Sequence, residues 1–230
     1  MQQDHTIHHR PIRSYVRREG RITPAQRRAL DELWPQFGID ADIPIQFEQV
    51  FGRQAPVVVE IGFGNGGALL QMARDNPDKN YIGIDTHRPG AGRLLLQLAE
   101  RELENVRVMC DDAKLILEKN FSPDSIDVVL IFFPDPWHKK RHHKRRLVQS
   151  DFVESIVRAL KPGGCIHVAT DWHDYAEHIM HVLSAESALE NCVGQFQYAA
   201  IPDYRPLTKY EQRGRALGHE VWDMIFQKAI

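Results

Sequence analysis

An aspartate held between two prolines stands at the end of an apolar run, and a dense group of basic residues follows it. The stretch reads VVLIFFPDPWHKKRHHKRR from Val128 to Arg146, and the aspartate is Asp135. A residue that precedes proline favours an extended backbone, which limits where the Asp135 carboxylate can point. The basic residues have no acid among them and predict a local positive field. They are Lys139, Lys140, Arg141, Lys144, Arg145 and Arg146.

A glycine-rich loop from Glu60 to Gly67 is the second stretch that could do chemistry. It follows a short apolar strand and precedes a helix, the context in which such a loop binds a cofactor. Glycine lets the backbone turn tightly and approach a ligand closely. The spacing satisfies both G-x-G-x-x-G and G-x-G-x-G, so a nicotinamide cofactor and S-adenosylmethionine are both open at this point. We expect the cofactor to contact Gly62, Gly64 and Gly66.

Three acids at the ends of successive predicted strands favour S-adenosylmethionine. Glu60 precedes the glycines, where it would repel a pyrophosphate at the helix N-terminus but attract the ammonium and sulfonium of S-adenosylmethionine. Asp85 ends the second strand and suits ribose hydroxyls. Asp112 ends the third strand, where we expect an adenine amino group. The acids therefore predict methyl transfer ahead of hydride transfer.

Strands alternate with helices along the chain, which predicts βαβ units and a mostly parallel sheet. Six apolar residues, 128–133, suit a strand buried on both faces, which the prolines end. The expected fold class is a Rossmann-like α/β domain with helices on both faces of its sheet. Strands are expected from residue 57 and at 80–85, 105–110, 126–133, 165–170, 195–200 and 219–226. Helices are expected at 68–76, 91–104, 113–119, 151–160 and 175–183.

The amino-terminal segment differs in composition from the rest. Residues 1–28 hold seven arginines against two acids, about +5, whereas the whole chain carries −2. This predicts either an arm that touches phosphates or a solvated tail. Thr23 and Pro24 predict the start of a short helix. We expect residues 1–37 to form the arm and this helix, and residues 38–230 to form one domain.

Composition narrows the remaining classes of protein. Hydrophobic residues make up 43% of the chain and charged residues 26%, the ordinary range for a globular domain. The three widely spaced cysteines form no Cys-x-x-Cys pair, and the twelve histidines are not spaced with acids as ligands. These patterns predict no disulfide framework and no metal. The hydrophilic start and the lack of an apolar run of ~20 residues predict a cytoplasmic protein without a membrane span.

The FFPDPWHKKRHHKRR block, the EIGFGNG loop and the later Thr208–Glu211 segment together resemble the bacterial tRNA (guanine-N7-)-methyltransferase family. The resemblance runs from about Ile22 onward. It implies a class I fold and methyl transfer from S-adenosylmethionine to a guanine in the tRNA variable loop. It implies cofactor contacts at Glu60, Asp85, Asp112 and Asp135, with Asp135 catalytic. It implies substrate contacts at Lys139, Asp171, Thr208, Lys209, Tyr210 and Glu211, and RNA contacts at Arg141, His142, His143, Lys144, Arg145 and Arg146.

This sequence departs from the family at two cofactor positions. The family often has Glu where this chain has Asp85, and Asn where it has Asp112. Both changes keep a hydrogen-bond acceptor. Asp171 also has a local interpretation, as the N-cap of the helix predicted at 175–183.

Guanine N7 has a lone pair and no proton, so its methylation needs alignment rather than a general base. Alignment can supply ~7–11 kcal/mol, and a nearby carboxylate can stabilise the positive charge that develops on the purine. We therefore expect Asp135 to orient and to compensate charge. Because N7 lies in the deep groove of an A-form helix, the guanine should be in a loop or displaced from its stack.

The expected partner is tRNA, with no obligate protein partner, and the chain is expected to be a monomer or a homodimer. Two other classes of function stay open. One is a nicotinamide-dependent oxidoreductase. The other is a non-catalytic RNA-binding protein on a methyltransferase fold.

Overall fold

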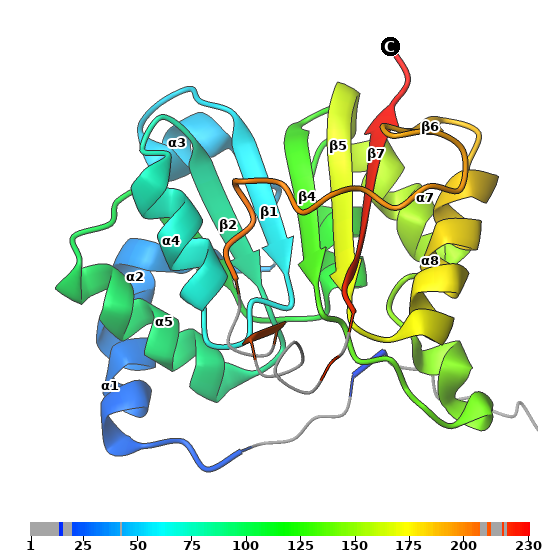
Figure 1. Cartoon of the computed structure of the whole chain (residues 1–230). Coiled ribbons are helices and arrows are strands. Elements are labelled where there is room, and N and C mark those ends of the chain that lie inside the picture. Colours follow the sequence, from blue (N-terminus) through cyan, green and yellow to red (C-terminus); the bar gives the residue numbers. More distant parts are fainter. Residues whose placement is uncertain (1–13, 16–19, 42, 208–210, 213–217, 219) are drawn as a thin grey trace, which may run out of the picture.

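The computed structural model describes residues 14–15, 20–41, 43–207, 211–212, 218 and 220–230. Seven strands form one sheet: β1 (Val57–Ile61), β2 (Asn80–Ile84), β3 (Val106–Met109), β4 (Ile126–Phe132), β5 (Leu160–Thr170), β6 (Leu189–Asn191) and β7 (Trp222–Lys228). Their order is β3-β2-β1-β4-β5-β7-β6 (Figure 1). The first five strands in this order pair in parallel, and β7 is antiparallel to both its neighbours. This confirms the predicted mostly parallel sheet.

Helices cover both faces of the sheet, as predicted. The helices are α1 (Pro24–Glu32), α2 (Trp34–Phe37), α3 (Phe47–Phe51), α4 (Gly67–Asp75), α5 (Arg88–Glu100), α6 (Ala113–Asn120), α7 (Ser150–Ala159) and α8 (His173–Ala185), with a short 3₁₀ helix, η1 (Lys140–Arg145). The apolar residues of α1, α2, α4 and α5 form one core, and those of α6, α7 and α8 form the other. Figure 1 shows the first group on the left of the sheet and α7 and α8 on the right. The residues of β1 and β2 are buried throughout, because both faces of these strands are covered.

The carboxyl-terminal strands differ from the prediction. The strand expected at 195–200 is wrong: only an isolated bridge from Ala199 to Asp223 forms there, and β6 lies earlier, at Leu189–Asn191. Gly194 and Phe196 have φ values of 112° and 56°, which turn the chain away from an extended conformation. β5 begins at Leu160, five residues before the predicted start at Cys165. The pattern of hydrophobic and polar residues on which the strand at 195–200 was predicted does not show the turns at Gly194 and Phe196.

Two amino-terminal segments pack more closely than the sequence indicated. Helix α3 forms ahead of β1, and its Phe47, Val50 and Phe51 pack on the core. Helix α1 was expected to be part of an appendage, yet its Ala29 and Leu30 are buried in the same core as α5. A Cβ added to Gly92 of α5 would lie 2.6 Å from the Gln26 carbonyl oxygen. Helix α1 therefore belongs to the packed body of the domain.

The amino end of α1 carries a capping box. The Thr23 hydroxyl accepts a hydrogen bond from the Gln26 N–H at 3.2 Å, and the Gln26 side chain accepts one from the Thr23 N–H at 2.8 Å. Pro24 follows at the first helical position, as predicted. No helix in the described ranges is long and apolar enough to cross a membrane.

Replacing Thr23 tests whether α1 contributes to the stability of the domain. Thr23→Ala removes one acceptor of the capping box and should lower the free energy of unfolding by about 1 kcal/mol. Urea denaturation measures this change, and Thr23→Ser, which keeps a hydroxyl, serves as the control. Equal unfolding midpoints for Thr23→Ala and the wild type would mean that α1 frays independently of the core.

Candidate active site

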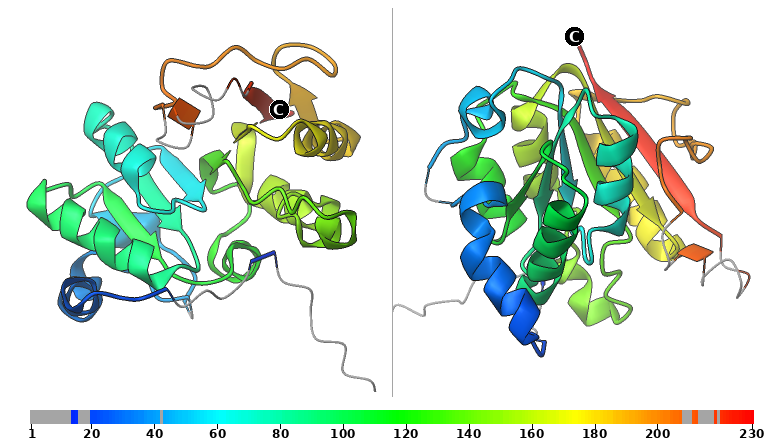
Figure 2. Two further views of the ribbon diagram at one scale, coloured as in Figure 1. Left: turned by 60° about the horizontal axis from the view of Figure 1, so that its bottom comes forward. Right: turned by 90° about the vertical axis from the view of Figure 1, so that its left-hand side faces the viewer.

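The order of the central strands places a crevice at the carboxyl edge of the sheet. β1 lies between β2 and β4, so the connections after neighbouring strands leave toward opposite faces, and ligands of open α/β sheets bind where this happens. Figure 2 brings this edge forward in its left view. Two adjoining cavities open along it, of about 360 Å³ and about 770 Å³. Both volumes lie in the ordinary range for small-molecule sites.

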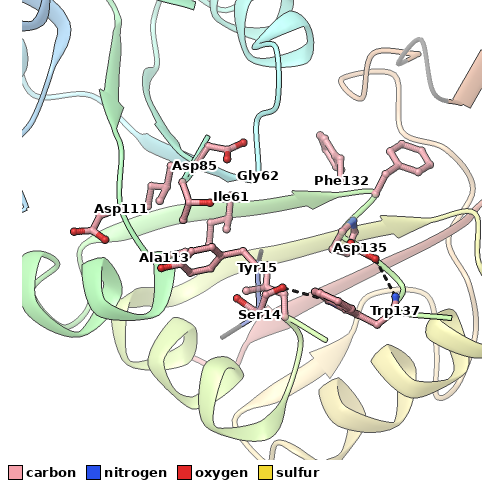
Figure 3. Close-up of a pocket in the computed structure, with 15 residues that line it drawn as sticks. Ser14, Tyr15, Ile61, Gly62, Asp85, Asp111, Ala113, Phe132, Asp135 and Trp137 are labelled. Atoms are coloured by element: carbon pink, nitrogen blue, oxygen red, sulfur yellow. Dashed lines mark hydrogen bonds between the residues drawn. The ribbon is translucent and has the colours of Figure 1, made fainter. Parts of the chain in front are cut away.

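The first cavity lies against the ends of β1, β2 and β4. Its walls include Gly62, Asp85, Asp111, Asp135 and Trp137 (Figure 3). The second cavity lies over the glycine loop, α4 and α5, and includes Glu60, Gly64 and Asp171. The two share the residues Gly62, Phe132, Phe133 and Pro134. One elongated ligand can therefore pass from the first cavity into the second across the glycine loop.

The glycine loop faces open space. Gly62 and Gly64 have φ values of 81° and 59°, and a Cβ added to either would meet no atom within 4 Å. Glycine is required at both positions because residues with a Cβ rarely adopt these positive φ angles. Gly66, with φ 75°, is the N-cap of α4 and packs against Leu94. The loop thus offers bare backbone to a ligand at Gly62 and Gly64, as the sequence predicted.

Asp85 holds the glycine loop in place. Its Oδ2 accepts a hydrogen bond from the Gly64 N–H at 2.9 Å, and its Oδ1 accepts one from the His87 N–H at 2.9 Å. Burial raises the pKa of this carboxyl, and the backbone hydrogen bonds oppose that rise. Since each carboxylate oxygen has a second lone pair, Asp85 can still accept hydroxyl hydrogens from a ligand in the first cavity.

Glu60 is the most perturbed acid of the site. Its side chain is 3% exposed, and burial, with a smaller contribution from Asp85, raises its pKa to about 8. Its Oε2 atom is buried and has no hydrogen-bond partner among the described residues. Such an atom is costly unless a ligand satisfies it. A cationic group next to Glu60 would both satisfy the oxygen and stabilise the ionised form.

The structure brings Asp111, rather than Asp112, to the wall of the first cavity. Asp112 is the N-cap of α6, where its Oδ1 accepts a hydrogen bond from the Lys114 N–H at 3.0 Å. The cofactor contact predicted for Asp112 stays a prediction. Sequence reasoning missed Asp111 because Asp111 and Asp112 both follow β3. They differ in the direction of the side chain, which the sequence does not show.

Backbone geometry fixes Asp135 at the mouth of the first cavity. Phe133 and Trp137, on either side of the Pro-Asp-Pro segment, have φ values of 53° and 48°, which are strained for residues other than glycine. The Asp135 Oδ1 accepts a hydrogen bond from the Trp137 N–H at 3.0 Å. The carboxylate is exposed and aimed by this turn, as predicted from the prolines.

Ser14 and Tyr15 also line the first cavity, and sequence reasoning missed both. The indole Nε1 of Trp137 donates a hydrogen bond to the Ser14 carbonyl oxygen at 3.2 Å. Figure 3 shows the Tyr15 ring near Ala113, on the side of the cavity away from Phe132. The only signal in the sequence was that Tyr15 is the single aromatic residue in 1–22. The basic arm therefore reaches the candidate cofactor site.

The basic run divides into exposed and buried cations. Lys139, Arg141 and Lys144 are exposed on and beside η1, whereas Arg146 is 3% exposed. Arg146 donates a hydrogen bond to the Pro136 carbonyl oxygen at 3.0 Å and pairs with Asp174, whose pKa it lowers. This geometry gives Arg146 a role inside the protein, where it supports the Pro-Asp-Pro turn, rather than the RNA contact expected from the sequence.

Two further residues of the run, His142 and His143, are half-buried. The His142 ring stacks edge-on against Trp137 with ring centroids 5.8 Å apart. His143 Nε2 lies 3.2 Å from an Arg146 nitrogen. Arg145 lies over the Trp137 ring, 5.1 Å from its centroid. The RNA contacts predicted for these three residues stay predictions; His142 and Arg145 also pack against Trp137, and His143 lies against Arg146.

The predicted substrate residues lie in different surroundings. Asp171 lines the second cavity. It does not cap α8, whose N-cap is Trp172, so the local interpretation of Asp171 is wrong. Lys139 is the residue before η1 and is absent from the walls of both cavities. Thr208, Lys209 and Tyr210 lie outside the described residues.

Glu211 is fully buried and forms a two-pronged ion pair with Arg205, at 2.5 and 3.0 Å. The Arg205 Nε lies 2.7 Å from Asp223 Oδ1, and Asp223 also contacts the buried His167 at 2.8 Å. Burial lowers the pKa of His167. These contacts connect Arg205 and Glu211 to β5 and β7. Its neighbours Leu207 and Gln212 line the second cavity, so Glu211 is placed to hold this wall.

Comparison with known proteins identifies the family. A family model described as "Putative methyltransferase" matches residues 54–224. A tRNA (guanine-N(7)-)-methyltransferase from Hydrogenovibrio crunogenus is 51% identical over 96% of this chain and 92% of its own length. One from Aeromonas hydrophila is 52% identical over 95% of this chain and 93% of its own length. The chain belongs to the tRNA (guanine-N(7)-)-methyltransferase family.

Solved structures support the fold of this family member. The 16S rRNA methyltransferase KamB matches with a TM-score of 0.60 at 15% identity, over 80% of this chain and 93% of its own. A SAM-dependent methyltransferase from Aquifex aeolicus matches with a TM-score of 0.54 at 12% identity, over 79% of this chain and 87% of its own. At these identities the likeness concerns the fold alone, and it confirms the predicted methyltransferase-like α/β class.

The residues of the methyltransferase site fit S-adenosylmethionine, the cofactor expected from the sequence. The unsatisfied Oε2 of Glu60 is buried beside the glycine loop, where the cofactor's ammonium would supply the missing hydrogen bond and charge. The open backbone at Gly62 and Gly64 leaves room for it, and Asp85 retains acceptor capacity for the ribose. Within the described ranges, no cluster of His, Cys, Asp and Glu is arranged to hold a metal ion.

The raised pKa of Glu60 makes cofactor binding and folding stability depend on pH. At neutral pH the free protein holds a proton on Glu60, and a cationic ligand should displace it. Affinity for S-adenosylmethionine should therefore rise with pH up to about 8, with release of one proton below that value. Calorimetry in buffers of different ionisation enthalpy measures the release. Glu60→Gln should show none, and equal proton release in both proteins would contradict the assignment.

The raised pKa of Glu60 affects folding stability in the opposite direction: the stability of the ligand-free protein should fall as pH rises. The folded protein binds this proton more tightly than the unfolded chain, so the stabilisation is full below 4.5 and is lost as pH rises through about 8. Without ligand, the melting temperature of the wild type should fall relative to that of Glu60→Gln between pH 5 and pH 9. A constant difference across this range would contradict the raised pKa.

The two kinds of cation in the basic run should respond differently to mutation. Arg146→Ala removes a buried hydrogen bond and the packing of the guanidinium on Tyr175, and should destabilise the protein by about 1–3 kcal/mol. Lys144→Ala should leave stability within about 0.5 kcal/mol and reduce the salt dependence of RNA binding. Denaturation and fluorescence anisotropy separate the two effects. The reverse pattern would place Arg146 on the RNA.

Proposed function

We propose that this chain transfers a methyl group from S-adenosylmethionine to N7 of a guanine in the variable loop of tRNA. The single observation that carries the proposal is the juxtaposition at one sheet edge of the buried Glu60, the glycine loop and the oriented Asp135. Membership of the tRNA (guanine-N(7)-)-methyltransferase family supports the choice of tRNA and of N7. A nicotinamide cofactor is disfavoured, because its pyrophosphate would lie beside Glu60.

The cofactor would supply a methyl group activated by a positively charged sulfur. In the proposed reaction the lone pair of guanine N7 forms the new bond to that methyl group, and the electrons of the sulfur–carbon bond return to sulfur. The positive charge moves onto the purine. Asp135, aimed by the Trp137 N–H, is placed to orient the reacting groups and to stabilise this charge. No proton has to leave N7 before the attack.

The proposed division of the site follows the charges of its walls. The first cavity, with Asp85 and Asp111, would hold the adenosine part, and Glu60 with the glycine loop would hold the amino-acid part. The remaining space of the second cavity, beside Asp171 and Pro134, would receive the guanine. The exposed cations of the basic run would hold RNA phosphates.

We also propose that the activity occurs in the cytoplasm, as expected from the sequence, and without an obligate protein partner. Analytical ultracentrifugation at the enzyme concentration used in the assay distinguishes the monomer from the homodimer.

Incubation with labelled S-adenosylmethionine and bulk tRNA tests the proposed reaction. We expect label in tRNA at a variable-loop guanine, and cleavage chemistry specific for 7-methylguanosine to map it there. A transcript with 7-deazaguanosine at that position lacks N7 and should accept no label. Label at another base, or equal labelling of the 7-deaza transcript, would refute the proposed reaction.

Asp135→Asn tests the role of the carboxylate. The amide keeps the size and the turn but loses the charge, so the rate of transfer should fall about 10²-fold while the affinity for S-adenosylmethionine changes little. Single-turnover rates and equilibrium binding measure the two quantities. Asp111→Asn, on the same cavity, serves as the control and should affect cofactor binding more than the transfer rate. Near-normal transfer by Asp135→Asn would contradict the role.

A further inference from the structure

Arg93 of α5 and Arg101, the C-cap of this helix, line the second cavity, and neither the basic run nor the cofactor site accounts for them. Arg93 and Arg101 face this cavity together with Gln97 between them. The three residues are four positions apart, which places them along one face of the helix. Eight residues of helix separate the two guanidinium-bearing positions by about 12 Å.

Neither arginine forms an ion pair with another described residue. Both are exposed. In the part of the chain that the structure describes, neither has a carboxylate partner within 4 Å, whereas Arg146 and Arg205 do. Exposed, unpaired arginines spaced along a cavity wall are free to bind an anionic ligand by charge-assisted hydrogen bonds.

A second observation at this wall points to a ligand. The side-chain oxygen Oε1 of Gln97 is buried and has no hydrogen-bond partner among the described residues. A buried acceptor without a donor is unfavourable, and a ligand hydroxyl or amino group in the cavity would satisfy it. Gln97 lies between the two arginines. A single ligand could therefore donate a hydrogen bond to the Gln97 oxygen and place anionic groups near both arginines.

The charged residues of the second cavity come from different elements. The acids Glu60 and Asp171 lie at or just after the carboxyl ends of β1 and β5, whereas Arg93 lies on α5 and Arg101 is the C-cap of that helix. A nucleotide in an RNA strand has the matching polarity, because its guanine becomes positive on methylation and its phosphates are negative. Two arginines whose positions lie about 12 Å apart along the helix axis can each bind a separate anionic group, and an RNA strand provides such a series of anions.

The wall also lies opposite the basic run. Figure 1 shows α5 to the left of the sheet, while α7 and α8, which follow the basic run, lie to the right. The Pro-Asp-Pro turn stands between them, with Asp135 on the first cavity and Pro136 on the second. An RNA strand held at both sides would present its target base over this turn.

We propose that Arg93, Gln97 and Arg101 form a second RNA-binding track, which holds the backbone of the strand next to the target guanine. The arginines bind phosphates, and the Gln97 oxygen accepts a hydrogen bond from a ribose 2′-hydroxyl. The inference rests on the proposed function, since it takes tRNA as the substrate. The competing occupant is the carboxylate of the cofactor's amino-acid tail, which a single arginine could bind.

The test compares Arg93→Ala, Arg101→Ala and the double variant with Arg74→Ala. Arg74 is an exposed arginine at the far end of α4 and lines neither cavity. Affinity for tRNA is measured by anisotropy over a range of salt concentrations without cofactor. Each track variant should bind several-fold more weakly, and the slope of log K against log salt should fall by about 1 per arginine. Arg74→Ala should match the wild type.

Phosphate-ethylation interference then locates the contacts. With the wild type, ethylation next to the variable-loop guanine should block binding. The double variant should lose this interference and keep that of the basic run, and Lys144→Ala should show the opposite loss. Unchanged salt slope and interference in the double variant would overturn the proposal. Weaker S-adenosylmethionine binding with unchanged tRNA binding would assign the arginines to the cofactor instead.

Binding and transfer are read separately, so the two proposals can fail separately. Suppose that the wild type binds tRNA but does not methylate N7, and that the double variant has a smaller salt slope. This result would refute the proposed reaction and support the RNA-binding track. Normal N7 methylation by the wild type, together with an unchanged salt slope in the double variant, would support the proposed reaction and refute the track. Gln97→Glu, which places a negative charge between the arginines, should weaken tRNA binding more than Gln97→Ala does, and equal effects would remove Gln97 from the track.

Discussion

The parallel pairing of β1 with both β2 and β4 is the constraint on which the rest of the site depends. The connection after β1 leaves toward one face of the sheet and the connection after β4 toward the other, and the space left between them is the crevice. Glu60 pairs with Gly83 on one side and Leu130 on the other, and its side chain is buried at the wall of the second cavity. The same pairing that builds the crevice therefore also produces the raised pKa of the acid beside it.

Buried polar groups fix the walls of this crevice. Asp85 ties the glycine loop to the end of β2, Arg146 supports the Pro-Asp-Pro turn, and Arg205 pairs with Glu211. Buried ion pairs add little net stability, because desolvation offsets their attraction. Their geometry is nevertheless specific, since breaking one leaves an uncompensated charge.

Sequence reasoning predicted the central elements well because their signals are local. The apolar runs of β1 and β4 mark strands that are buried on both faces, and Thr23 with Pro24 marks the start of α1 through a capping box. The strand expected at 195–200 was wrong because turns at Gly194 and Phe196 depend on backbone angles. Arg146 and Arg141 are indistinguishable as letters, yet one is buried and the other is exposed.

The sequence by itself determined the fold class, the family, the glycine loop and the orienting turn at Asp135, because each depends on residue types at short, fixed spacing. Tertiary structure alone decided which side chains reach the site. It turned Asp111 into the cavity and Asp112 onto α6, placed Tyr15 beside the strand ends, and left Arg93 and Arg101 facing the second cavity. The physical reason is that side-chain direction and burial depend on neighbours far away in the chain, which spacing along a sequence does not encode.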